Sequence, residues 1–154
     1  VARVALADLV SQAVAASANT AAARNIDLGV AASDPAACVT GNAEALRTLL
    51  DNLVGNAVRY TPAGGRIDVS CGSSADHAWL EVSDNGPGIP AAERERVFDR
   101  FYRRSGQEVA GSGLGLAIVR AIADKHRAGI ELTDAPGGGL RVRVDFPPLP
   151  AGQS

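Results

Sequence analysis

The chain has 154 residues, of which 46% are hydrophobic, and a formal net charge of −2 at pH 7, which predicts one globular domain with a core of its own. The near-neutral charge excludes a general attraction to nucleic acid, and no apolar run approaches the roughly 20 residues of a membrane-spanning helix. A Walker-type phosphate loop is also excluded, because the single lysine, Lys125, does not follow a glycine.

Residues 6–60 predict two helices with two strands between them. Apolar residues at helical spacing predict an amphipathic helix over 6–23. Strand-like segments at 25–31 and 37–41 flank the breaker Ser-Asp-Pro. A second helix is predicted over 42–60, with Asn42 as its N-cap.

The rest of the chain predicts two hairpins and a third main helix. Segments 66–73 and 77–84 alternate with period two and are joined by a short polar turn, which is typical of a hairpin. The remaining predicted segments are a short helix over 91–101, a polar glycine-rich stretch over 102–113, a helix over about 114–127, and a hairpin around a glycine turn over 129–147.

These elements predict an α/β sandwich of the α+β class, in which three main helices cover one face of a mixed, largely antiparallel sheet of about five strands. The domain is expected to span 1–148, with a tail at 149–154. Because the chain begins with Val1 rather than Met, we expect it to be a domain excised from a longer protein. Cys38 and Cys71 show no metal-ligand spacing, so two reduced thiols are expected.

The second helix carries a polar stripe beside its apolar face. At 100° per residue, Leu46, Leu50, Leu53 and Ala57 form the core face. The stripe next to it consists of Asn52, Asn56, Arg59 and Tyr60. Two asparagines one turn apart are unfavourable in mid-helix, which favours the wall of a pocket over a solvated flank, although the stripe by itself leaves both readings open.

Asp84 ends a strand on the same side as the apolar residues Leu80 and Val82. A carboxylate there is costly unless hydrogen-bond donors meet it. One interpretation is an Asx turn that caps the following loop, and the other is an acceptor for the amino group of a ligand. In the second case Gly86 and Gly88 let the backbone approach a flat ligand, and Ile89 covers one face of it.

The segment "GSGLGL", residues 111–116, is a glycine loop that leads into a helix. It is not a dinucleotide-binding fingerprint, because position 116 is leucine. Free N–H groups and the helix dipole nevertheless favour a phosphate at such a place. A loose connector is the alternative, and the nearby Arg103 and Arg104 favour a flap that closes over phosphate.

Four segments in this order resemble the N, G1, F and G2 boxes of sensor histidine kinases. They are "LLDNLVGNAVRYTP" at 49–62, "DNGPGIP" at 84–90, "RVFDRFYR" at 96–103 and "GSGLGLAIV" at 111–119. The resemblance implies the catalytic, ATP-binding domain of such a kinase, with the GHKL (Bergerat) fold. It also implies that the chain binds ATP and Mg²⁺ and transfers the γ-phosphate to a histidine.

The resemblance assigns roles to single residues. Asn56 matches the asparagine that holds Mg²⁺ against the phosphates, Arg59 and Arg103 match phosphate-contacting positions, and Tyr60 matches the aromatic residue beside adenine. Asp84 matches the acceptor for the adenine amino group. The residues that shape the pocket or close over the phosphates are Gly86, Gly88, Ile89, Gly111, Ser112, Gly113, Leu114, Gly115 and Leu116, and Phe98 and Phe101 anchor the lid.

Asn52 occupies the position of the glutamate that orients the attacking water in ATPases of the same superfamily. Because a carboxamide is not a strong base, the resemblance implies transfer to a protein histidine rather than to water. The alternatives are an ATPase of the GHKL type, a non-catalytic nucleotide-sensing module, and a related anti-sigma serine kinase.

The resemblance places the acceptor histidine on a dimerisation domain upstream of this chain. His77, in a predicted hairpin turn, and His126, at the end of the third helix, are expected to be surface or structural residues. The expected partners are the parent's own phosphoacceptor domain and, through the full-length kinase, a response regulator. We expect a monomeric chain from a homodimeric parent, cytoplasmic and attached to a bacterial inner-membrane sensor. "KHRAGI" at 125–130 departs from the family's usual "HGG", which leaves that turn in doubt.

Overall fold

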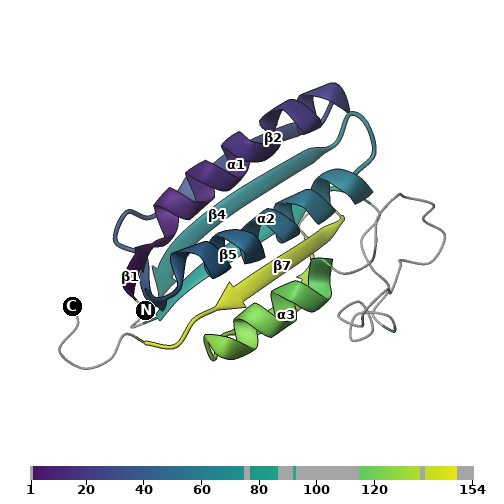
Figure 1. The fold of residues 1–154 in the computed structure, drawn as a ribbon. Helices are drawn as coiled ribbons and strands as arrows, with labels where there is room; N and C mark the ends of the chain where they lie inside the picture. The colour runs from purple at the N-terminus through teal and green to yellow at the C-terminus, as the bar shows by residue number, and fades with distance from the viewer. Residues whose placement is uncertain (1, 75–76, 87–91, 93–114, 136–137, 149–154) are drawn as a thin grey trace.

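The computed structural model describes residues 2–74, 77–86, 92, 115–135 and 138–148. Figure 1 shows two layers, with three helices on one face of a β-sheet. The helices are α1 (Leu6–Ala23), α2 (Ala43–Tyr60) and α3 (Gly115–Lys125), which confirms the three predicted main helices. None of the described helices is long and apolar enough to cross a membrane. The helix predicted over 91–101 and the glycine-rich stretch over 102–113 lie outside the described residues.

The sheet has five strands in the order β2-β4-β5-β7-β6. Their bounds are β2 (Asp27–Ser33), β4 (Arg66–Ser74), β5 (His77–Asp84), β6 (Gly129–Asp134) and β7 (Leu140–Asp145). β2 pairs with β4 in parallel and the other pairs are antiparallel. The mixed, largely antiparallel sheet and both hairpins are therefore confirmed.

Two features at the N-terminal end differ from the prediction. A short strand β1 (Ala2–Ala5) pairs with β3 (Cys38–Gly41) in a separate two-stranded sheet, a contact between segments that are distant in sequence. The strand predicted from residue 25 begins at Asp27, because the N–H groups of Asn25 and Ile26 still bond to carbonyls of α1 and Asn25 adopts a φ of 55°. Both differences arise from hydrogen bonds that residue periodicity does not report.

Helix α2 is the centre of the core. It packs against α1 on one side and α3 on the other, above β4 and β5. The four predicted core residues of α2 are buried, and so are Leu49, Val54 and Val58. The neighbouring helices cover the flanks of α2, and the sheet covers its underside. Along β5, burial alternates with period two through Ala78, Leu80, Val82 and Asp84. Asp84 therefore faces the helical layer.

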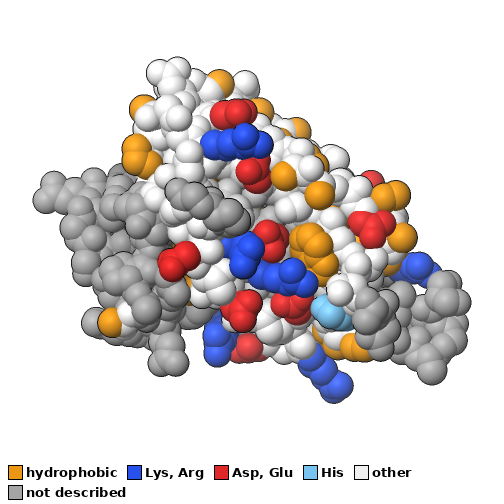
Figure 2. All heavy atoms as spheres, turned by 180° about the vertical axis from the view of Figure 1, so that it is seen from behind, with side chains coloured by type: hydrophobic (Ala, Val, Ile, Leu, Met, Phe, Trp, Pro, Cys, Tyr) orange, Lys and Arg blue, Asp and Glu red, His pale blue; other side chains and the backbone are white. Residues whose placement is uncertain are grey.

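The opposite face of the sheet carries side chains of both charges around apolar ones, as Figure 2 shows. The ring of Trp79 packs against Gly72, where a Cβ would lie 2.5 Å from it, and the Arg143 guanidinium lies 4.6 Å from the ring centroid. Arg143 also pairs with Asp145 at 3.0 Å. His77, next to the predicted hairpin turn, is the first residue of β5, which begins where the predicted segment 77–84 does, and its Nε2 lies 3.3 Å from Asp145 Oδ1. It is half-buried beside Arg143 and Asp145, which agrees with the expected surface or structural residue.

His126 joins the end of α3 to the start of α2. Its Nε2 lies 3.1 Å from the backbone N–H of Asn42 and accepts from it, while Nδ1 lies 2.8 Å from the Ile122 carbonyl, so the neutral ring carries its proton on Nδ1. Asn42 in turn caps α2 by accepting from the Ala45 N–H at 2.9 Å. The turn left in doubt is a helix C-cap in which Arg127 has a φ of 57°.

We expect His126→Ala to lower the free energy of unfolding by ~1–3 kcal/mol, because it leaves the Asn42 N–H and the Ile122 carbonyl without their partner. Denaturation in urea measures this. The matched control is the exposed neighbour Lys125→Ala, for which we expect a change within ~0.5 kcal/mol. Equal effects of the two substitutions would contradict a bridging role for the imidazole.

Candidate functional site

The C-terminal end of α2 and the end of β5 meet at Gly86. A Cβ built on Gly86 would lie 3.2 Å from Asp84 Oδ1 and 3.4 Å from both the Thr61 Cα and the Tyr60 carbonyl oxygen. The end of the helix that carries the polar stripe and the strand-end carboxylate are thus neighbours, although they are more than twenty residues apart in sequence.

Asp84 is 7% exposed and its charge is met by backbone donors. Its Oδ1 accepts from the N–H of Gly86 at 2.9 Å and from the N–H of Leu140, on β7, at 3.3 Å. The first of these bonds is the predicted Asx turn. Backbone donors therefore meet this buried carboxylate, as its burial requires.

The glycine turn between β6 and β7 packs directly on the end of β5. Gly139 has a φ of 91°, and a Cβ there would lie 2.0 Å from the Asp84 carbonyl oxygen. Asn85 closes the other side, because its Oδ1 accepts from the Arg66 N–H at 2.7 Å and its own N–H donates to the Arg66 carbonyl. The sequence predicts a glycine turn here, but nothing in it marks Gly139 or Asn85 as supports of Asp84.

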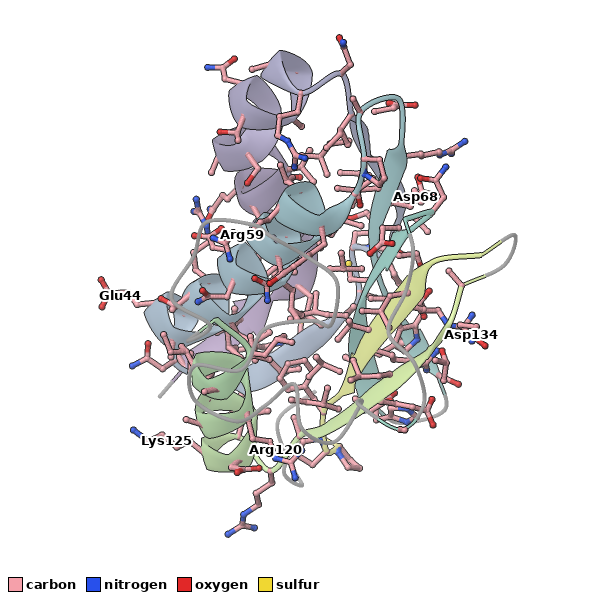
Figure 3. The ribbon with its side chains drawn as sticks, turned by 90° about the vertical axis from the view of Figure 1, so that its right-hand side faces the viewer. Glu44, Arg59, Asp68, Arg120, Lys125 and Asp134 are labelled. Carbon is pink, nitrogen blue, oxygen red and sulfur yellow. The ribbon has the colours of Figure 1, made fainter. Side chains whose placement is uncertain are left out.

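The four residues of the α2 stripe are half-buried along one flank of the helix. Arg59 donates from Nη1 to Asn56 Oδ1 at 3.1 Å, one turn of helix apart. Figure 3 shows Arg59 in the helical layer, with Asp68 and Asp134 across from it on the sheet. Asn56 and Arg59 thus form one polar unit near the end of α2 that meets Asp84.

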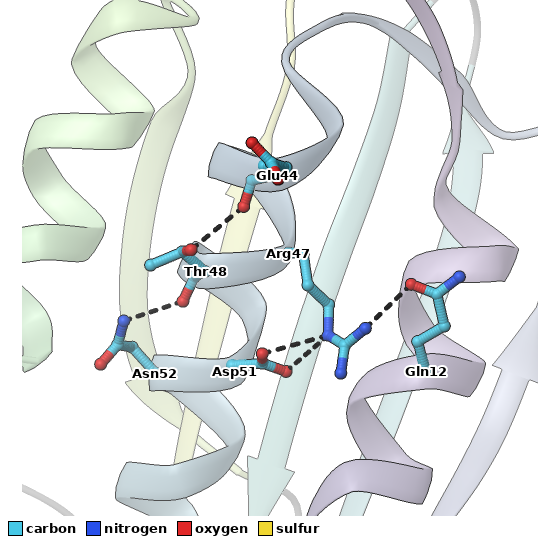
Figure 4. A network of polar contacts seen from close by, with 6 residues as sticks. All are labelled: Gln12, Glu44, Arg47, Thr48, Asp51 and Asn52. Carbon is cyan, nitrogen blue, oxygen red and sulfur yellow. Dashed lines mark hydrogen bonds and ion pairs between the residues drawn. The ribbon is translucent and has the colours of Figure 1, made fainter.

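Asn52 has a different partner, shown in Figure 4. Its Nδ2 donates to the Thr48 carbonyl at 2.8 Å, and the Thr48 hydroxyl donates to the Glu44 carbonyl at 3.0 Å. Beside them Arg47 bonds to Asp51 and to Gln12 of α1. The carboxamide of Asn52 is therefore tied to its own helix.

The described donors suit Mg²⁺ only in company with a ligand that brings oxygens of its own. No group of three or more His, Cys, Asp or Glu side chains gathers among the described residues. Asn56 Oδ1 is a neutral oxygen donor on the partly open flank of α2, and Mg²⁺ is usually shared between one or two protein oxygens, water and phosphate. A site of that shared kind fits these residues.

Several predicted site residues lie outside the described part of the chain: Gly88, Ile89, Phe98, Phe101, Arg103, Arg104, Gly111, Ser112, Gly113 and Leu114. Gly115 is the first residue of α3, and Leu116 is 8% exposed and packs in the hydrophobic core. Cys38 and Cys71 are both free thiols, as predicted.

The chain is similar in sequence to a known protein family and to named sensor kinases. Residues 41–151 match the family described as histidine kinase-, DNA gyrase B-, and HSP90-like ATPase. The sensor protein kinase PmrB of Pseudomonas aeruginosa is 46% identical over 104 residues, which cover 66% of this chain and 22% of PmrB. The chain spans between 20% and 32% of the length of the curated relatives it matches.

Two solved structures share the fold over nearly the whole chain. The mycobacterial sensor histidine kinase MprB is 30% identical, with a TM-score of 0.86, and the match covers 96% of this chain and 99% of that one. Full-length ShkA in complex with AMPPNP is 27% identical, with a TM-score of 0.83, and the match covers 95% of this chain and 30% of ShkA. These matches confirm the predicted fold class.

We expect Gly139→Ala to destabilise the protein more than Gly138→Ala. Both glycines have positive φ, of 91° and 103°, so both substitutions carry backbone strain of ~1–3 kcal/mol. A Cβ at Gly138 meets nothing within 4 Å, whereas one at Gly139 collides with the Asp84 carbonyl. The difference between the two unfolding free energies, measured in urea, reports the contact alone, and equal values would contradict it.

Proposed function

Because the chain belongs to the histidine kinase-, DNA gyrase B- and HSP90-like ATPase family, we propose that it is the ATP-binding catalytic domain of a sensor histidine kinase. It binds Mg·ATP and donates the γ-phosphate to a histidine on the dimerisation domain of its parent. The observation that supports the proposal is that the end of α2, the helix that carries the Asn56–Arg59 unit, meets the end of β5, which carries Asp84, at Gly86.

Asp84 forms the end of the proposed site that binds the nucleobase, the base end. Its carboxylate accepts from the amino group of adenine, while the N–H groups of Gly86 and Leu140 hold it in place. Guanine would present a keto oxygen to the same carboxylate and lose that hydrogen bond. Tyr60, the last residue of α2, lies beside the adenine in this proposal, to which the resemblance adds contacts from Gly88 and Ile89.

Asn56 and Arg59 form the phosphate end. In the described state Arg59 donates to Asn56 Oδ1, and an incoming triphosphate offers the guanidinium a stronger, charged acceptor. Arg59 then turns to phosphate and leaves Asn56 Oδ1 to Mg²⁺. When bound, Mg²⁺ would neutralise part of the phosphate charge. The resemblance adds Arg103 and residues 111–116 to the phosphate contacts, and of these only Gly115 and Leu116 are among the described residues.

Asn52 favours transfer to a side chain over hydrolysis. Its amide donates to the Thr48 carbonyl within α2, and a carboxamide does not accept a proton from water at neutral pH. Catalysis in this site consists mainly of positioning and charge neutralisation. The nucleophile comes from the partner domain.

The parent protein completes the proposed reaction. Its dimerisation domain supplies the acceptor histidine and makes the parent a homodimer, and a response regulator receives the phosphoryl group. Because the domain uses ATP and meets a response regulator, it lies on the cytoplasmic side of a bacterial sensor anchored in the inner membrane.

We expect calorimetric titration with AMPPNP to show binding that is stronger with Mg²⁺ than without it. Asn56→Ala should weaken binding in Mg²⁺ by at least ~10-fold and abolish the effect of Mg²⁺, because it removes the metal's protein ligand. Asp84→Asn should weaken binding to a similar degree with and without Mg²⁺.

The matched controls carry the same substitutions outside the site. They are Asn19→Ala on the exposed side of α1 and Asp68→Asn on β4, which pairs with Arg66. Both should bind as the unmodified chain does. If Asn56→Ala still responded to Mg²⁺ like the unmodified chain, the assigned role of Asn56 would be wrong.

The phosphotransfer reaction itself is tested with the parent's dimerisation domain supplied as a separate protein. We expect ATP to label that domain with phosphate that is lost in acid and kept in alkali, as phosphohistidine is, and the chain alone to release phosphate slowly. Acid-stable labelling of a partner would indicate a serine kinase instead. Rapid phosphate release by the chain alone would indicate an ATPase.

A further inference from the structure

Thr61 carries a buried hydroxyl without a partner. The residue is 0% exposed, and its Oγ1 is the one buried side-chain polar atom among the described residues that makes no hydrogen bond. Burying a hydroxyl without compensation is unfavourable, and native proteins rarely leave such a group unsatisfied. Valine has nearly the same shape and would fill this position without that cost, so the hydroxyl calls for a role that the described contacts do not supply.

The position of Thr61 is fixed by its backbone and its methyl group. The residue follows the last residue of α2, and its N–H donates to the Ala57 carbonyl at 2.9 Å. Its methyl carbon faces Gly65, where a Cβ would lie 2.3 Å from it. The hydroxyl, on another bond of the same tetrahedral carbon, is therefore directed away from Gly65.

This residue lies at the base end of the proposed site. The Thr61 Cα and Asp84 Oδ1 both lie within 3.4 Å of the point where Gly86 would carry a Cβ. A buried, unpaired hydroxyl thus borders the same glycine as the buried carboxylate that accepts from the base. Buried polar groups that remain unpaired until a ligand arrives are a source of specificity. A ligand that cannot form a hydrogen bond with such a group leaves it unpaired and therefore binds less tightly.

We propose that the Thr61 hydroxyl is a second polar contact of the base site, paired when the purine is bound, and that it contributes to base recognition together with Asp84. The inference rests on the proposed function, since it takes the nucleotide base as the ligand at Gly86. It assigns to Thr61 a contact with the ligand and not a part in holding the fold.

Thr61→Val tests this, because it removes the hydroxyl and keeps the shape. The free variant should be at least as stable as the unmodified chain, since it loses an unpaired group, and its affinity for AMPPNP should fall about 5- to 15-fold, as the loss of one hydrogen bond predicts. The same fold-loss is expected for ADP without Mg²⁺, because the contact is with the base. Thr61→Ser, which keeps the hydroxyl, should retain most of the affinity.

Two results would overturn the inference. Unchanged affinity of Thr61→Val would show that the hydroxyl does not contact the ligand. A lower unfolding midpoint of the free variant would show that the hydroxyl already has a partner in the free protein. Titrating the unmodified chain and Asn56→Ala with AMPPNP distinguishes failure of the Thr61 inference from failure of the proposed function. If the unmodified chain does not bind AMPPNP, both proposals fail, whereas tight binding by the unmodified chain and Thr61→Val alike refutes the role of Thr61 alone.

Discussion

The burial of one carboxylate organises this domain. Period-two alternation turns Asp84 toward the helical layer, where an ion needs donors to replace water. Those donors are backbone N–H groups from two separate segments, the loop at Gly86 and the start of β7 at Leu140. Both N–H groups can reach Asp84 Oδ1 only if the β6–β7 turn packs directly on the end of β5. At that contact no residue larger than glycine fits position 139.

Helix α2 links this carboxylate to the rest of the molecule. At its first turn, Asn42 and His126 tie it to the end of α3, and near its last turn the Arg24 guanidinium, from the end of α1, donates to the Val58 carbonyl. The helix is thus held at both ends by its neighbours. Side chains that must meet a ligand with defined geometry benefit from such a rigid support, and Asn56 and Arg59 lie on either side of the second anchoring point, Val58.

Much of this could be predicted from local pattern, and the rest depends on contacts that no pattern reports. Helical spacing predicts α2 and its polar stripe, and alternation along β5 predicts the side on which Asp84 lies. Three features, in contrast, depend on segments that meet only in the folded chain. They are the β1–β3 pairing, the close contact of Gly139 with the Asp84 carbonyl, and the burial of the unpaired Thr61 hydroxyl. The bond between Arg59 and Asn56 follows helical spacing, but many pairs at that spacing make none.

The two ends of the proposed site differ in how firmly they are set before a ligand arrives. At the base end, Asp84 is buried and held by two backbone donors. At the phosphate end, the half-buried Asn56 and Arg59 are bonded to each other, and under the proposed function they exchange that bond for bonds to the ligand. A rigid base end can select the nucleotide before the phosphate end rearranges around it. That order suits a domain that holds its nucleotide for a nucleophile carried by another domain, because Asn52 does not prepare a water for attack in the meantime.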